Sequence, residues 1–251
     1  HPQALDADAA IERALVCVAA GRERDARISN SEGASVAYGE GMSVYANSHG
    51  FIGHGRGTSF SLSLSLIAGE GEAMQRDGWY DVHCHGGSLQ SPEALGRIAA
   101  ERAVARLAPR PAPTGRFPVL FVAEVARSLI GALLSAVSGG ALYRRASFLL
   151  DHLGKPVLPA GIDLIEYPHR LRGHRSAAFD ADGVGTVGSA LVRDGVLQRY
   201  LLGSYSARKL GMETTGNAGG VHNLDITTGR DDFAALVRGM GRGLVVTELM
   251  G

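Results

Sequence analysis

The stretch Phe60-Ser-Leu62-Ser-Leu64-Ser-Leu66 decides how the first part of this sequence folds. Side chains on a strand alternate between two faces, so Phe60 and the three leucines share one face and the serines share the other. The stretch therefore predicts a strand with one buried face. Turn signals surround it, with Asn-Ser-Glu-Gly at 30–33, Asn-Ser-His-Gly at 47–50 and Gly-Glu-Gly-Glu at 69–72. Their spacing predicts a β-meander over residues 25–81.

Two helices are expected to flank the meander. Residues 4–20 are rich in alanine, and this helix-favouring pattern ends before Gly21. The pattern predicts a helix over residues 4–20. A second helix should begin at Ser91-Pro92-Glu93, where serine can cap and proline fits the first turn, and should run to about Leu107. The prolines that follow cannot continue a helix, so residues 109–116 predict a connector between a region 1–108 and a domain 117–251.

The second half predicts a further sheet region with its own helices. Residues 117–123 are typical of a buried strand, and 124–137 of an apolar helix that lies inside a large core. Asp194-Gly195 lies between two short apolar runs, which indicates a two-residue hairpin. Short helices over 206–210 and 231–238 and a strand over 243–247 complete the pattern. The expected fold class is α+β, with an antiparallel β-meander, a second mixed sheet region and flanking helices.

Composition limits the classes of partner. The chain has 251 residues with 25 Lys and Arg against 25 Asp and Glu, so no overall field attracts nucleic acid or an anionic membrane. The longest uncharged run, 128–143, is too short for a spanning helix. Only two cysteines are present, and the first residues show no secretory signal, which favours a reducing compartment. We therefore expect a cytoplasmic protein that contacts neither nucleic acid nor membrane.

Few residue patterns suggest a reactive centre. His83, Cys84 and His85 could present two imidazoles from one strand face, but a zinc site needs three or four ligands, so an ordinary loop or packing position is favoured and any other role stays open. The Gly-rich segment 53–57 lies between strand-like runs, which disfavours a phosphate loop. Neither a Gly-x-Ser-x-Gly elbow nor an HExxH or HExxxH motif occurs. Glu124 and Asp163 are isolated carboxylates that fit cap or surface positions.

Residues 204–223 are the strongest candidate for a binding segment. They combine hydroxyls, basic groups and a glycine cluster whose backbone N–H groups could hold a peptide or a carboxylate. Ordinary turn chemistry is the alternative, because small polar residues and glycine also dominate loops. The residues assigned to substrate or partner binding are Ser204, Tyr205, Ser206, Arg208, Lys209, Thr215, Asn217, Gly219, Gly220 and His222.

Long motifs in this sequence resemble the TldD/PmbA peptidase family, also called modulators of DNA gyrase. They are residues 138–159, 179–186, 194–223 and 241–251, together with 44–53 and 74–80 of the meander. The similarity is to the PmbA/TldE type of subunit. It implies the family's C-terminal-type fold and a cytoplasmic metallopeptidase in which such a subunit pairs with a TldD-type subunit and acts on unfolded peptides. Proteins of this type carry a further N-terminal domain and a Gly-rich C-terminal tail that these residues do not match, so the domain 117–251 is expected to be incomplete at its end.

The resemblance also implies that this chain carries no catalytic residue and no metal. TldD-type sequences have HExxxH, which binds zinc and activates water, where this chain has Leu134, Ser135 and Gly139. Zinc is thus expected in the TldD-type partner of a heterodimer, with a homodimer possible for this chain alone. Two alternatives stay open: an independent metallopeptidase with ligands such as His83, His85 and His222, and an interaction protein that modulates DNA gyrase indirectly.

Overall fold

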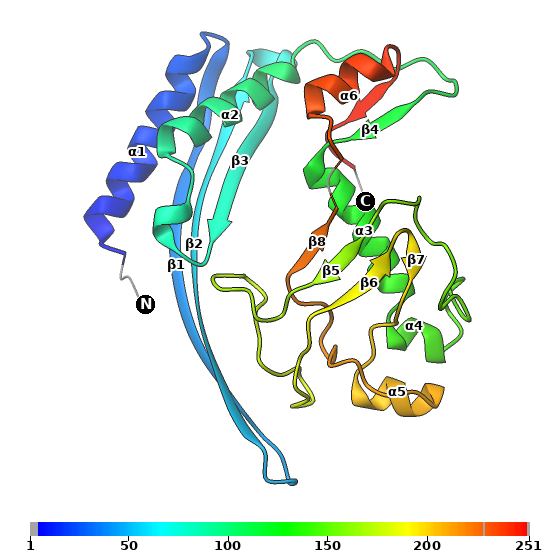
Figure 1. Ribbon diagram of the computed structural model, residues 1–251. Helices are drawn as coiled ribbons and strands as arrows, with labels where there is room; N and C mark the ends of the chain where they lie inside the picture. The colour runs from blue at the N-terminus through cyan, green and yellow to red at the C-terminus, as the bar shows by residue number, and fades with distance from the viewer. Residues whose placement is uncertain (1–4, 228, 250–251) are drawn as a thin grey trace. The chain divides into compact units, whose positions relative to one another are not determined.

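The structure is a computed structural model that describes residues 5–227 and 229–249 (Figure 1). The chain divides into two compact units. The first contains residues 1–44 and 54–112, and the second contains residues 45–53 and 113–251. The tip of one long hairpin, residues 45–53, is therefore grouped with the second unit.

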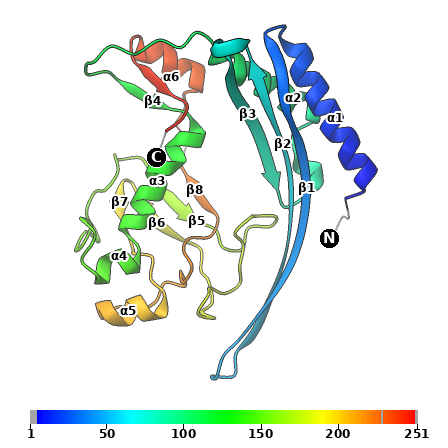
Figure 2. The same cartoon turned by 180° about the vertical axis from the view of Figure 1, so that it is seen from behind.

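The first unit is a three-stranded sheet with two helices on one face (Figures 1 and 2). Its strands follow the chain order, and β2 pairs with β3 in antiparallel register, with Leu64 opposite Trp79. One turn of 3-10 helix precedes β3 at Gly71–Ala73, and another follows it at Gly86–Ser88. The elements are α1 (Ala7–Arg24), β1 (Ile28–Ala46), β2 (Ile52–Ala68), β3 (Gln75–His83) and α2 (Pro92–Ala105).

The leucine face of β2 forms the core of the first unit, as its alternation predicts. Leu62, Leu64 and Leu66 are at most 2% exposed, whereas the serines between them are only partly buried. Ala99 and Ala103 of α2 are fully buried in the same cluster. Ser91 caps α2 by accepting a hydrogen bond from the N–H of Ala94, with Pro92 in the first turn. Apolar burial on this scale is the main stabilising contribution to such a unit.

Two local predictions in this unit are wrong, and glycine explains both. The Asn-Ser-Glu-Gly signal is no turn but lies inside β1, where Gly33 has φ 105° and its N–H donates to Ser31 Oγ. A glycine of this kind interrupts the strand pattern without ending the strand. Helix α1 continues through Gly21 to Arg24. A side chain at Gly21 would lie 2.8 Å from Leu66 Cδ1, so this glycine allows the helix to approach the sheet closely.

The second unit contains two sheets. Strands β4 (Val119–Phe121) and β9 (Leu244–Val246) are parallel. The other sheet has the order β7-β6-β5-β8 and is antiparallel throughout. Its strands are β5 (Leu164–Glu166), β6 (Ser189–Arg193), β7 (Val196–Leu197) and β8 (Leu224–Ile226), and the helices of the unit are α3 (Ala123–Ala136), α4 (Gly139–Tyr143), α5 (Ser204–Leu210) and α6 (Phe233–Met240).

The α+β class and the second sheet region are thus confirmed, as is the hairpin at Asp194-Gly195. Both turn residues have positive φ, 48° and 76°, which is typical of a two-residue hairpin turn. Helix α3 differs from the prediction of a fully enclosed helix. Within it only Val125 is buried, and Leu129 is half exposed, because just one side of the helix packs against the core of the unit. Among the described residues, no helix is both long and apolar enough to cross a bilayer.

Candidate functional site

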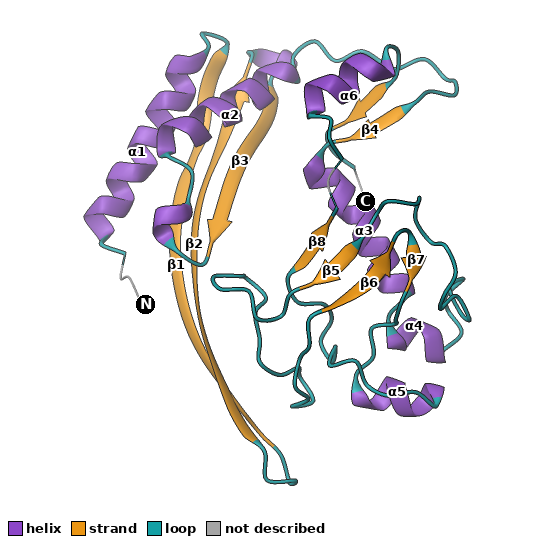
Figure 3. Ribbon diagram, in the orientation of Figure 1, coloured by secondary structure: helices purple, strands orange, loops and turns teal. Residues whose placement is uncertain are grey.

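A cleft of about 640 Å³ lies in the second unit, where the end of α3, the start of α4, helix α5 and the turn 217–221 meet. Hydrogen bonds between Leu201 and the α3–α4 junction hold these elements together: the N–H of Leu201 donates to Val137 O, and the N–H of Gly139 donates to Leu201 O. Figure 3 shows that much of the chain between β5 and β6 and between α5 and β8 is loop. The site is therefore built mainly from irregular backbone, and hydrogen bonds must position it.

The structure brings half of the predicted binding residues to this cleft. Tyr205, Ser206, Asn217, Gly219 and Gly220 line it. The exposed ring of Tyr205 packs edge-on against Tyr143, with 5.6 Å between ring centroids. The result is an aromatic wall beside a turn whose two glycines carry no side chains.

The other predicted residues lie elsewhere. The N–H of Ser204 donates to Asp182 Oδ2. Arg208 and Lys209 are in the last turn of α5, and the Lys209 ammonium lies 5.7 Å from the centre of the Tyr205 ring. Thr215 is turned inward, where its hydroxyl accepts from the N–H of Leu202. Neither Arg208 nor Lys209 lines the cleft.

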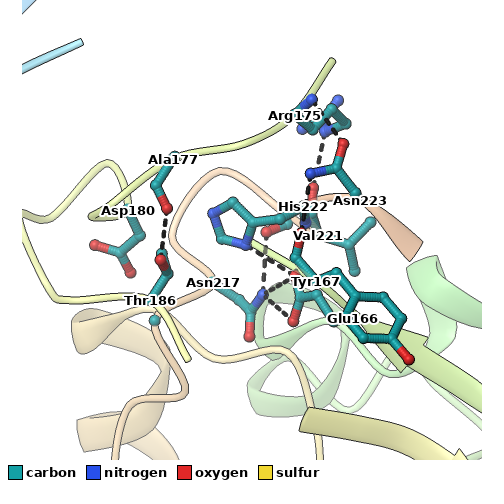
Figure 4. Close-up of polar contacts among 12 residues, drawn as sticks. Glu166, Tyr167, Arg175, Ala177, Asp180, Thr186, Asn217, Val221, His222 and Asn223 are labelled. Carbon is teal, nitrogen blue, oxygen red and sulfur yellow. Dashed lines mark hydrogen bonds and ion pairs between the residues drawn. The ribbon is translucent and has the colours of Figure 1, made fainter. Parts of the chain in front are cut away.

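A buried carboxylate, Glu166, supports the floor of the site (Figure 4). It forms an ion pair with Arg199 and accepts a hydrogen bond of 3.0 Å from Asn217 Nδ2. Its Oε1 also accepts the backbone N–H of His222 and lies 2.8 Å from His222 Nδ1. Glu166 thus joins strand β5 to the segment before α5, to the start of the turn 217–221 and to His222, which follows the turn.

The environment keeps Glu166 ionised. Burial alone would raise the pKa of this carboxyl, but the backbone N–H of His222, the charge of Arg199, and the side chains of His222 and Asn217 outweigh burial and hold the pKa below its ordinary value. A buried charge is tolerated when it is paired and fully hydrogen-bonded. Asn217 is accordingly part of the scaffold as well as the cleft wall, since its Oδ1 also accepts from Arg199 and Thr215.

A second cleft, of about 340 Å³, adjoins the other side of the turn. It is lined by His222, Arg175 and Asp180, and it shares Gly219 and Gly220 with the first cleft. Asp180 is buried, and its two oxygens accept backbone N–H groups of Asp182, Val184 and Ala218. The turn 217–221 therefore has one face on each cleft.

The three positions that the family resemblance assigns to HExxxH all line the first cleft, yet their residues do not fit zinc. Leu134 and Ser135 end α3, and Gly139 begins α4. None of the three supplies an imidazole or a carboxylate, the groups that this motif uses to bind zinc and activate water. A side chain at Gly139 would overlap the side chain of Ser206 in α5, so a ligand could not replace this glycine unless α5 moved or Ser206 changed.

Comparison with known proteins decides the family. Residues 114–251 match the family described as PmbA/TldA metallopeptidase C-terminal domain, and residues 1–107 match its central domain. The chain belongs to the PmbA/TldD metallopeptidase family. It is 44% identical to Metalloprotease PmbA of Escherichia coli O157:H7 over the whole of this chain, and it spans about half of that relative, 56% of its length.

Solved structures of similar proteins agree with the fold. A protein from Bacteroides thetaiotaomicron described as a modulator of DNA gyrase superposes with a TM-score of 0.91 at 29% identity, over 98% of this chain and 56% of that one. TldE from Thermococcus kodakarensis superposes with a TM-score of 0.85 at 21% identity, over all of this chain and 60% of that one. The second likeness concerns the fold alone.

His83 and His85 of the first unit do not belong to a metal-binding group in the described part of the chain. His83 Nε2 lies 3.2 Å from Asp81 Oδ1, and the carbonyl of Cys84 accepts a hydrogen bond from Thr58 Oγ1. Across residues 5–227 and 229–249, no group of three or more His, Cys, Asp or Glu residues is arranged to hold a metal ion. The Thr58 contact ties the end of β3 to β2.

Glu166, Arg199 and Arg175 carry no signal in the sequence that marks them as site residues. Glu166 lies in the short run Leu-Ile-Glu, where the burial of a carboxylate has no periodic pattern. Asp163, which the sequence alone presents as an isolated carboxylate, accepts the N–H of Asp194 and pairs with Arg193. These partners follow it by about thirty residues, and only the fold brings them together.

Proposed function

We propose that this chain is the metal-free subunit of a TldD-type metallopeptidase and completes the chamber that binds the peptide substrate. One observation carries the proposal: Leu134, Ser135 and Gly139 line the same cleft as the Gly219–Gly220 turn. Where the family's zinc motif would lie, this chain offers apolar and small groups that can contact a peptide but cannot activate water. Zinc and the attacking water would belong to the TldD-type partner of the heterodimer.

The cleft suits an extended, unfolded peptide. Gly219 and Gly220 have φ of 95° and 106° and carry no side chain, so a second backbone can approach them closely. Tyr205, Tyr143 and Leu134 offer apolar surface for substrate side chains. Backbone hydrogen bonds combined with side-chain pockets are the usual way to hold a strand-like peptide. Arg208 and Lys209, at the end of α5 and outside the cleft, are then candidates for contact with the partner.

Reconstitution tests the proposal directly. An unstructured peptide is incubated with the purified chain, with a TldD-type subunit, and with an equimolar mixture, and bound zinc is quantified in each sample. We expect cleavage that requires the mixture and zinc that follows the TldD-type subunit. Cleavage by this chain alone, with stoichiometric zinc that is lost on His83→Ala or His85→Ala, would instead establish the independent metallopeptidase.

A pair of glycine variants tests the cleft itself. Gly220→Val places a branched side chain on the turn, and we expect the mixture to assemble poorly or to cleave slowly. Gly161→Val is the matched control, because Gly161 also has positive φ (84°) and open space around it but lies outside both clefts. Both variants must remain folded by circular dichroism. Equal activity of the two would reduce residues 217–221 to an ordinary turn.

Two further assignments belong to the same proposal. Both cysteines are free thiols, which suits the reducing cytoplasm. The heterodimer would meet unfolded peptides in that compartment. An effect on DNA gyrase would then be indirect and act through proteolysis, because the balanced charge of this chain offers no general attraction for DNA.

A further inference from the structure

Arg175 lies at the turn between the two clefts and is fixed in place (Figure 4). Its backbone N–H donates to Asn223 Oδ1 at 3.0 Å, and its Nε donates to the carbonyl of Val221 at 2.8 Å. Asn223 is itself held, because its Nδ2 donates to Tyr167 O and Ser176 Oγ. The arginine is thus anchored at both its backbone and its guanidinium.

The segment that carries Arg175 packs tightly against Asn223. A side chain at Gly173 would lie 2.6 Å from both polar atoms of the Asn223 amide, so the absence of a side chain there allows this contact. A guanidinium held in this way loses less conformational entropy when it binds a ligand than a free surface arginine does.

The two terminal nitrogens of Arg175 remain available. Within residues 5–227 and 229–249, neither Nη1 nor Nη2 makes a hydrogen bond. Nη2 is 3.9 Å from the position that a side chain on Gly220 would take, which places it over the glycine turn. The N–H of Gly220 donates to Asn217 O, whereas the N–H groups of Gly219 and Val221 have no protein acceptor in the described structure. Unpaired donors beside a guanidinium fork suit an anion.

Nearby carboxylates decide which cleft an anion would enter. Asp182 lines the first cleft and would repel an anion there. It does not line the second cleft, where both oxygens of Asp180 face backbone N–H groups, three in all, whose partial positive charges offset part of its charge. Glu166 is paired with Arg199. His174 and His222 also line the second cleft, and His222 binds Glu166 through Nδ1.

We propose that Arg175 and the Gly219–Gly220 turn form an anchor in the second cleft for a carboxylate group of the bound peptide. The inference rests on the proposed function and sharpens it, because it gives the peptide a fixed end and a preferred chemistry. An Asp or Glu side chain and a free C-terminus present the same group. A bidentate contact between guanidinium and carboxylate supplies both strength and direction.

Calorimetric titration of the folded chain with matched peptides tests this anchor. The probes are N-acetylated peptides of Ala, Ser, Gly and Leu with a free C-terminus, with a C-terminal amide, and with an amide plus one internal Asp or Asn. Charge-assisted hydrogen bonds of this kind correspond to a difference of about tenfold or more in Kd. We expect one or both carboxylate peptides to bind more tightly than their neutral counterparts by that factor, and the pair that differs identifies the source of the carboxylate.

Three variants assign the effect to Arg175. Arg175→Gln should abolish the preference for the carboxylate, and Arg175→Lys should retain only part of it, because lysine keeps the charge but not the fork. Arg172→Gln removes a positive charge three residues away, from an exposed position that lines neither cleft, and should retain the full preference.

The outcomes separate this inference from the proposed function. If the wild-type chain binds acidic and neutral peptides equally, the anchor is wrong while peptide binding stands. The anchor is also wrong if Arg172→Gln removes the preference as fully as Arg175→Gln does, since a general field would then be the cause. If no peptide binds to the chain alone or to its mixture with a TldD-type subunit, the proposed function fails and the anchor fails with it.

Discussion

Strands β2 and β5 bury side chains equally well but by opposite means. On β2, the leucines at 62, 64 and 66 are excluded from water by apolar neighbours, and this packing requires only side chains of complementary shape. On β5, Leu164 and Glu166 are both at most 1% exposed and point to the same face, yet Glu166 needs donors from Arg199, Asn217 and His222. Burial by shape tolerates local change, whereas burial of a charge depends on several distant segments at once.

The largest effect should come from the buried charge. Glu166→Gln leaves Arg199 without its counter-ion and should destabilise the protein by about 3–5 kcal/mol, as expected when one partner of a buried ion pair is removed. Glu213→Gln, on an exposed position after α5, is the matched control and should change little. Denaturant unfolding measures both. A loss below about 1 kcal/mol for Glu166→Gln, on the order of a surface ion pair, would mean that the two strands do not differ in this way.

The leucine face comes next. Leu64→Ala should cost about 2–5 kcal/mol, because it removes buried methyl groups and leaves a cavity, whereas Ser63→Ala should change stability little. Urea titrations of the two variants test the register of β2. Equal losses would contradict the assignment of alternate residues to the core.

A smaller effect should separate two helical glycines. A side chain at Gly96 of α2 would overlap the carbonyl oxygen of Cys17 in α1, so Gly96→Ala should destabilise by about 1–3 kcal/mol through overpacking. Gly131 of α3 has open space around it, and Gly131→Ala should stabilise by about 0.5–1 kcal/mol by favouring the helix. Thermal unfolding of both variants tests whether the two changes in stability have opposite signs. Stabilisation by Gly96→Ala would show that the close approach of α1 and α2 is not essential, and destabilisation by Gly131→Ala would show that the space around α3 is not open.

The smallest effect is a dependence on pH. The pKa of Glu166 is lowered in the folded protein, so the unfolded chain takes up this proton first as the pH falls. The stability that the ionised carboxylate contributes is therefore present above about pH 4.3, its unfolded pKa, and is lost as the pH falls through the folded pKa. The difference in unfolding free energy between wild type and Glu166→Gln should shrink over that window. A constant difference down to the folded pKa would contradict it.

The same contrast explains what can be predicted from the sequence. The alternation at 60–66, the cap at Ser91 and the Asp194-Gly195 turn are local signals, and the structure confirms each of them. Strands β5 and β8 are three residues long and carry no period, so the sequence does not predict them.

The candidate site is predictable only in part, for a related reason. The sequence identifies Gly219 and Gly220 as a cluster, but Arg175 and Glu166 come from other segments that hydrogen bonds bring to the turn. Arg208 and Lys209 are close to the turn in sequence, although they lie outside the cleft. Proximity in sequence does not specify which face of a short helix meets a loop.

The close packing of Gly139 against Ser206 restricts which side chains position 139 can hold. Introducing HExxxH would take Leu134→His, Ser135→Glu and Gly139→His, and the last change collides with Ser206 on α5. No order of these three substitutions avoids that collision unless α5 is altered first. Because α5 packs against this glycine, a histidine at position 139 also requires a change in α5, so the three substitutions alone cannot introduce the motif without an unfavourable step.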